Sequence, residues 1–171
     1  MEIESVQFTR ADLEAFADEL VEHERVALAD RLERDSARLA ELAAQLDESN
    51  ARRARDGGWS AHEILAHIAV FSKFHGMLTY KVGSGQFTEI DLLGSVQQRD
   101  TAGARMAALL LPELLQAIQS GHRHTVEYLR SADATAMKRR VDIGDASLSA
   151  DEIARLFLCA HLDQLERAIA T

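Results

Sequence analysis

Residues 57–80 read GGWSAHEILAHIAVFSKFHGMLTY, and the other elements of the chain are best placed relative to this segment. Its two glycines end whatever structure precedes them. Ser60 is a good N-cap residue and Glu63 stands three residues later, so the pair predicts a capping box at the start of a helix. Trp59 and Ile64 have the spacing of a hydrophobic staple across the same helix start.

The predicted helix carries an apolar stripe with steps of three and four residues, which is typical of a helix with one face on a core. The stripe consists of Ile64, His67, Ile68, Phe71, Phe74 and Leu78. His67 lies inside this stripe rather than beside it. Because a buried polar group without a partner is costly, the ring nitrogens of His67 need a partner in the interior.

A first helix is predicted before this segment. It begins at Thr9, which has Asp12 three residues later in capping-box spacing, and it continues to about residue 49. Roughly forty residues of helix would extend about 60 Å, which is long for a small domain. We therefore expect a bend or break between residues 21 and 29, where the apolar pattern is weakest.

Two more principal helices are predicted after the helix that begins at Ser60. Pro112 suits the first turn of the third helix, and Ser149 with Glu152 repeats the capping box at the start of the last. The long connection between the second and third helices contains a short helix at residues 95–111, and residues 140–143 alternate in polarity and are expected to be extended. The sequence therefore predicts an all-α fold, an antiparallel four-helix bundle with a long connection between helices 2 and 3.

Length and composition restrict the class of protein. The 171 residues suffice for one domain, so we expect residues 1–171 to form a single helical bundle with an irregular N-terminus at residues 1–9. A net charge of -9 argues against nucleic acid and anionic membranes as partners, and no apolar run approaches a membrane span. The acidic, mixed N-terminus does not read as a signal peptide, and Cys159, the only cysteine, can form no internal disulfide, so we expect a cytoplasmic protein.

Three short motifs connect the chain to a known family. They are GWS at residues 58–60, EILAHI at residues 63–68 and AHLDQL at residues 160–165. With these motifs, and with the same helix order, the chain resembles the DinB/YfiT-like family of four-helix bundles from about Ala37 onward. The resemblance implies the bundle fold reached above from the helix pattern.

The resemblance also implies a metal site. The family typically holds a divalent metal on three histidines, one from the second helix and two from the last helix at positions i and i+4. In this chain the matching positions are His67, His161 and Phe157, and phenylalanine cannot bind a metal. A catalytic zinc-type site usually has three protein ligands, so His67 and His161 form an incomplete set for a metal such as zinc or nickel.

The sequence leaves open what completes or replaces this site. Glu63 is one turn before His67, although the capping box also requires its side chain, and His122 is predicted on the inner face of the third helix. Alternatively the site has been abandoned. His67 and His161 would then be hydrogen-bonded core histidines, and Phe157 would fill the space of the metal.

Two classes of function follow from the resemblance. The first is a metal-dependent enzyme for small molecules that transfers a low-molecular-weight thiol or hydrolyses its substrate, in a pocket between the second and fourth helices. A metal lowers the pKa of a bound thiol or water and so supplies the nucleophile. The second is a non-catalytic bundle that binds a small molecule or acts in a stress response and has lost its metal. In either case we expect a small-molecule ligand in a pocket between helices, and a homodimer formed through the first helix.

Overall fold

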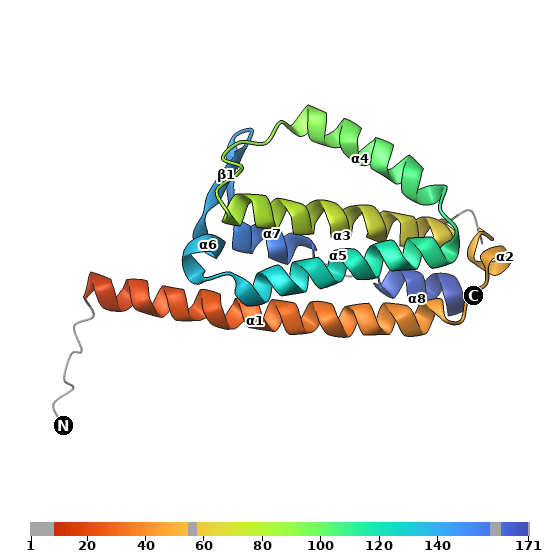
Figure 1. Cartoon of the computed structure of the whole chain (residues 1–171), viewed down its shortest axis with the longest axis horizontal. Helices are drawn as coiled ribbons and strands as arrows, with labels where there is room; N and C mark the ends of the chain where they lie inside the picture. Colours follow the sequence, from red (N-terminus) through yellow and green to blue (C-terminus); the bar gives the residue numbers. More distant parts are fainter. Residues whose placement is uncertain (1–8, 55–57, 158–161, 171) are drawn as a thin grey trace, which may run out of the picture.

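A computed structural model gives the fold (Figure 1). The structure describes residues 9–54, 58–157 and 162–170, and for residues 92–96 and 157 it describes the backbone alone. Within these residues the chain forms eight helices and one two-stranded sheet. In chain order the elements are α1 (Arg10–Ala43), α2 (Glu48–Ala51), α3 (Ala61–Gly83), α4 (Leu92–Ala107), α5 (Leu111–Ser131), α6 (Ala134–Lys138), β1 (Arg140–Ile143), β2 (Ala146–Ser149), α7 (Ala150–Phe157) and α8 (Leu162–Ala170).

The long helices form a bundle, which confirms the predicted fold class. Helices α1, α3 and α5 run side by side, and α7 and α8 occupy the place of the fourth helix (Figure 1). The predicted last helix corresponds to α7 and α8, and residues 158–161 between them lie outside the described residues. Helix α4, the predicted short helix of the long connection, packs on α3 on the outside of the bundle.

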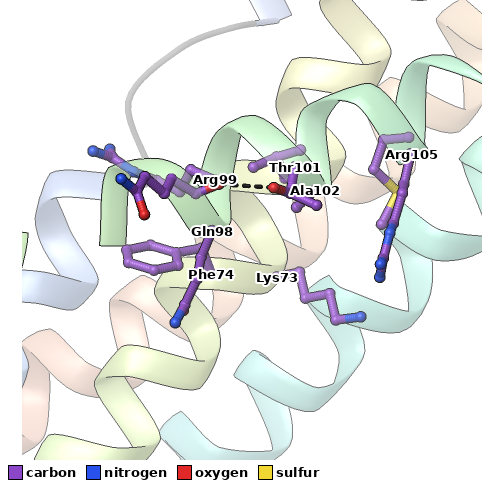
Figure 2. Close-up of a pocket in the computed structure, with 10 residues that line it drawn as sticks. Lys73, Phe74, Gln98, Arg99, Thr101, Ala102 and Arg105 are labelled. Carbon is purple, nitrogen blue, oxygen red and sulfur yellow. Dashed lines mark hydrogen bonds between the residues drawn. The ribbon is translucent and has the colours of Figure 1, made fainter. Parts of the chain in front are cut away.

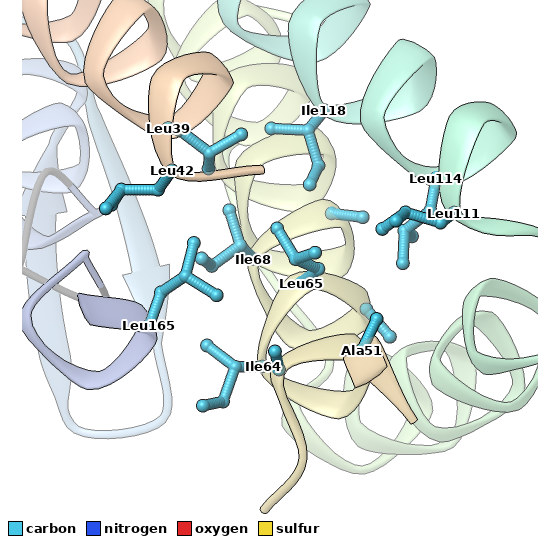
Figure 3. Packing of buried hydrophobic residues seen from close by; sticks show 13 residues of the cluster. Leu39, Leu42, Ala51, Ile64, Leu65, Ile68, Leu111, Leu114, Ile118 and Leu165 are labelled. Carbon is cyan, nitrogen blue, oxygen red and sulfur yellow. The ribbon is translucent and has the colours of Figure 1, made fainter. Parts of the chain in front are cut away.

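The main hydrophobic core lies where α1, α3, α5 and α8 meet (Figure 3). Helix α3 contributes more of its members than any other helix, because it is covered by a neighbour on several sides. The cluster contains Leu39, Leu42, Ala51, Ala61, Ile64, Leu65, Ala66, Ile68, Ala69, Leu111, Leu114, Ile118 and Leu165. This core places α3 at the centre of the molecule and fixes which of its residues face outward.

Helix α1 is continuous, so the expected break between residues 21 and 29 is wrong. This part of the helix is anchored by tertiary contacts that the sequence pattern did not show. Leu28 and Ala29 are buried in a second core cluster with Leu129 of α5. The buried Arg25 donates hydrogen bonds to the backbone oxygen of Leu129 and to Glu22. Packing of this kind, rather than local propensity, provides most helical stability in proteins.

The predicted capping boxes are present at the starts of three helices. At α3 the backbone N–H of Ser60 donates to the Glu63 carboxylate at 2.8 Å, and the N–H of Glu63 donates to the Ser60 hydroxyl at 3.2 Å. Thr9 with Asp12 caps α1 in the same way. The equivalent bonds between Ser149 and Glu152 measure 2.7 and 3.1 Å. Each box satisfies backbone donors that the first turn of a helix leaves unpaired.

A hairpin closes the end of the bundle at which α3 finishes. Strands β1 and β2 pair antiparallel, which confirms the extended conformation predicted for residues 140–143. Gly144 has a φ of 60°, a conformation that glycine adopts without strain. Val141 packs with Leu78, Val82 and Ile153 in a third core cluster. No helix in the part of the chain that the structure describes is long and apolar enough to cross a membrane.

Candidate functional site

His67 is half-buried on α3, between two aromatic rings. The centroid of its imidazole lies 5.2 Å from that of Trp59 and 4.2 Å from that of Phe71. Trp59 is 57% exposed, so its ring does not close the core as a staple would and instead covers one side of the histidine. The rings therefore hold the imidazole at the edge of the bundle.

The helix geometry explains why His67 faces outward. Ile64 and Ile68 are buried in the main core. Successive residues of an α-helix are separated by about 100° around the axis, so His67 points to a different side of α3 from Ile68. That side is covered by α4. The sequence predicts His67 in a pocket against the last helix and gives no sign of the α4 side of this residue.

His67 lines a cavity of roughly 620 Å³ between α3 and α4. Trp59, which precedes α3, and Glu63 of α3 line it on one side, and Asp100 and Gly103 line it from α4. A Cβ atom built on Gly103 would meet no atom within 4 Å, so the space beside this glycine is open. The volume falls in the range of roughly 300–1,000 Å³ that is typical of small-molecule sites.

Glu63 is committed to the helix start. Its carboxylate accepts hydrogen bonds from both the backbone N–H and the hydroxyl of Ser60, each at 2.8 Å. These bonds to the ionised form lower the pKa of Glu63. A carboxylate held in this way is a poor candidate for a metal ligand beside His67.

His122 is not brought to the same cavity. It lies buried on α5, with its Nε2 atom 2.8 Å from the hydroxyl oxygen of Ser72 on α3. Burial lowers its pKa to about 4, so the ring is neutral at pH 7. It lines a separate cavity of roughly 510 Å³ between α1 and α5. The structure therefore does not support His122 as the missing ligand.

The described residues do not by themselves make a metal site. His161, the second expected ligand, lies outside the described residues, and so does Cys159; the backbone of Phe157 ends α7. Within residues 9–54, 58–157 and 162–170, no three His, Cys, Asp or Glu side chains could together hold a metal ion. Of the expected ligands, the structure thus places His67 alone.

A second cavity adjoins the first, and sequence reasoning missed its cationic residues. It measures roughly 530 Å³ and is lined by Lys73 of α3 and by Arg99 and Arg105 of α4 (Figure 2). Val70 and Arg99 line both cavities, so the two spaces meet under α4. We call them together the α3–α4 cleft. The sequence did hold one signal, because none of these three cations has a carboxylate three or four residues away.

The comparison with protein families agrees with the fold. The family model described as the DinB superfamily matches residues 31–164. The chain belongs to the DinB superfamily. This confirms the resemblance seen in the sequence motifs. No curated protein matches the chain.

Two solved structures share the DinB fold with this chain. One is the mycothiol-dependent maleylpyruvate isomerase, with a TM-score of 0.66 and 15% identity over 85% of this chain and 59% of the other. The second is a mutant of that enzyme, with a TM-score of 0.64 and 16% identity over 80% of this chain and 56% of the other. The chain thus spans little more than half the length of either protein. At this level of identity the likeness shows the fold alone.

Proposed function

We propose that this DinB superfamily member binds a small molecule in the α3–α4 cleft, next to His67. The observation that carries the proposal is the place of His67. The residue at the family's ligand position lines an open cavity of roughly 620 Å³ and stands between the rings of Trp59 and Phe71. Aromatic walls with a few convergent polar groups are typical of sites for small organic ligands.

We further propose that the protein acts as an enzyme of thiol transfer or hydrolysis, with His67 and His161 as protein ligands of a divalent metal, zinc or nickel. The resemblance supports this reaction class, and so does the thiol dependence named for the structurally similar isomerase. Among the residues that the structure describes, no three-ligand set is present.

The alternative is a non-catalytic bundle that binds its ligand without a metal. Two observations favour it. Glu63 is held by Ser60 and is not free to complete a site. The sequence has Phe157 where the family has a third histidine. Under this alternative the same cleft binds the small molecule, and His67 contributes a polar contact to it.

The single tryptophan of the chain makes the two functions easy to separate. Trp59 contacts the His67 ring, so Ni²⁺ at His67 will quench its fluorescence. Tag-free protein titrated with Ni²⁺ should show saturable quenching with one ion per chain, and His67→Ala should abolish it. His124→Ala, which removes an exposed histidine of α5, is the matched control and should leave the titration unchanged.

A flat titration would contradict the metal-dependent function. In that case neither Ni²⁺ nor Zn²⁺ should change the melting temperature, and the non-catalytic alternative stands. Phe157→His then provides the positive control, because it supplies the third histidine of the family pattern and should create metal binding. If this variant binds metal no better than the parent, the assignment of positions is wrong.

We also propose a homodimer in the cytoplasm. The N-terminal part of α1 exposes Leu13, Phe16 and Leu20 at 56%, 59% and 49%, and burying such residues against a second copy is favourable. The lone Cys159, which can form no internal disulfide, supports the location. Light scattering should give twice the chain mass for the parent and the chain mass for Phe16→Ser. A monomeric parent at high concentration would contradict the dimer.

A further inference from the structure

We propose that Lys73, Arg99 and Arg105 bind an oxyanion of the ligand, a carboxylate or a phosphate, that is carried on an apolar body. This inference rests on the proposed function and names the chemical class of the molecule that the α3–α4 cleft takes. Three features of the cleft support it: the charge of the cavity that these cations line, the environment of Arg99 and the apolar wall. The residues that both cavities share connect the anion to His67.

The cavity lined by Lys73, Arg99 and Arg105 is positively charged, whereas the whole chain is negatively charged. The protein has a net charge of -9, yet three cations line the cavity and no Asp or Glu is among its lining residues. Many arginines elsewhere in the described chain are paired with carboxylates. Arg38 with Glu166 is one example, at 2.8 Å. Lys73, Arg99 and Arg105 have no carboxylate within 4 Å among the described residues. Unpaired cations gathered in a concave site favour an anion.

Of the three cations, Arg99 is the best placed to bind an oxyanion. Its Nε atom is buried and has no hydrogen-bond partner in the described structure. Its guanidinium carbon lies 5.6 Å from the centroid of the Phe74 ring, a contact that orients the side chain. A buried donor without an acceptor is costly, and a guanidinium presents a planar fork that matches two oxygens of a carboxylate or phosphate. An oxyanion would supply the missing acceptor.

The remaining wall of the cavity is apolar. Val70 and Phe74 of α3 and Met106 of α4 line it, together with the cations that Figure 2 shows on both helices. A purely inorganic anion would leave this wall in water. A ligand with an oxyanion at one end and a hydrocarbon or aromatic body would cover it, and burying apolar area is favourable.

The shared lining connects this anion site to His67. Because Arg99 and Val70 belong to both cavities, an oxyanion held by Arg99 lies next to the space that His67 lines. The opposite end of the same ligand can then extend along α3 toward Trp59 and His67. Lys73, Arg99 and Arg105 would thus be binding residues that orient the ligand, and His67 would meet its other end.

The test uses small probes of matched size and the full chain without metal. Hexanoate, hexyl phosphate, inorganic phosphate and hexanol are titrated in EDTA by calorimetry. Hexanoate or hexyl phosphate should bind at least about tenfold more tightly than hexanol, because only the anions offer a guanidinium a charged acceptor with more than one oxygen. Whichever hexyl anion binds more tightly identifies the oxyanion. Inorganic phosphate should bind more weakly than hexyl phosphate, because it cannot cover the apolar wall.

Variants assign the binding to these residues. Arg99→Gln and Lys73→Gln should each weaken the better hexyl anion by about tenfold, as expected for the loss of one charge-assisted hydrogen bond. Arg34→Gln on the exposed surface of α1 is the matched control and should change affinity by less than about twofold. Lys73 is itself exposed, so its variant should fold even if Arg99→Gln does not.

Two results would overturn the inference. One is equal affinity of the parent for hexanol and for both hexyl anions. The other is binding of the anion by folded Arg99→Gln or Lys73→Gln as tightly as by the parent. Because EDTA removes metals, a failed Ni²⁺ titration at His67 does not affect this outcome. Conversely, loss of anion binding leaves the Trp59 titration with Ni²⁺ unchanged.

Discussion

The side of α3 that packs on α5 and the side that faces α4 differ in how closely the helices approach. Against α5, a Cβ atom on Gly76 would collide with the Thr125 side chain, and one on Gly121 would lie 3.7 Å from the backbone of Lys73. Against α4, the site of Gly103 is open and two cavities separate the helices. The glycines Gly76 and Gly121 thus lie where α3 and α5 are in close contact, whereas Gly103 lies beside free space between α3 and α4.

This difference separates stability from ligand binding within one helix. The α5 side of α3 meets Leu114 and Ile118, which are fully buried in the main core. The α4 side presents His67 and Lys73, whose polar groups would be costly in a dry core. Helix α4 can lie over this side without filling it, because the bundle is already held together by α1, α5, α7 and α8. Polar side chains that could bind a ligand are tolerated on the α4 side of α3, because tight packing there is not needed to hold the bundle together.

The largest loss of stability should come from a substitution on the side of α3 that packs on α5. Ile118→Ala removes a side chain with 0% exposure and should cost about 2–5 kcal/mol of the free energy of unfolding, measured by urea denaturation. Met106→Ala on the α4 side, where the residue is partly buried, should cost on the order of 1 kcal/mol. Equal losses in the two variants would show that both sides are packed alike.

Acid should lower the free energy of unfolding through His122, which lies on α5 next to Ser72 of α3. Burial lowers the pKa of this histidine to about 4 from about 6.5, so the unfolded chain binds its proton more readily than the folded one. Its contribution is complete above pH 6.5 and is lost as the pH falls toward 4, by about 3 kcal/mol in all. Urea unfolding at several pH values should show this loss in the parent and a smaller one in His122→Gln. Identical pH profiles would contradict it.

A methyl group at Gly76, where α3 meets Thr125 of α5, should be tolerated poorly. Gly76→Ala forces the Thr125 side chain to move, and the hydrogen bond of its hydroxyl to the backbone oxygen of Gly121, 3.0 Å long, is then strained. The expected loss is about 1–3 kcal/mol in thermal or urea unfolding. Thr125→Ala in the same chain removes the hydroxyl that the new methyl group would meet and should recover part of the loss, a coupling that a double-mutant cycle measures. A neutral Gly76→Ala would mean that the helices are not in close contact here.

The smallest change in the free energy of unfolding, and the only increase, is expected from a substitution on the α4 side. Gly103→Ala adds a methyl group in open space within a helix and should raise the free energy of unfolding by about 0.5–1 kcal/mol. A rise in melting temperature of the variant would be the readout. If the substitution instead destabilises the protein, α4 lies closer to α3 than the cleft allows.

Local signals made much of the fold predictable from sequence. The boxes at Ser60 and Ser149 start α3 and α7 as expected, and Pro112 stands in the first turn of α5. These signals depend on residues only three or four positions apart, which sequence shows directly. The continuity of α1 was not predictable in this way. The part of this helix between residues 21 and 29 is anchored by tertiary contacts such as that between Arg25 and Leu129, which are 104 residues apart.

The candidate site was predictable only in part. The motif around His67 identified the residue, but its neighbours across the cleft come from α4, whose position depends on tertiary packing. Arg99 and Arg105 could have been noticed as helical cations without a carboxylate at three or four residues. Whether His67 and His161 share a ligand stays a prediction, because His161 lies outside the described residues.

The most direct test follows the Nε–H resonance of Arg99 in a ¹⁵N-labelled sample during a hexanoate titration. The signal is assigned with Arg99→Gln, in which it is absent. Because this donor is buried without a partner, a bound oxyanion should shift its proton downfield and slow its exchange with water, while the signal of Arg34 stays in place. If hexanoate binds and the Arg99 signal does not move, the anion lies elsewhere and the cleft is not the binding site.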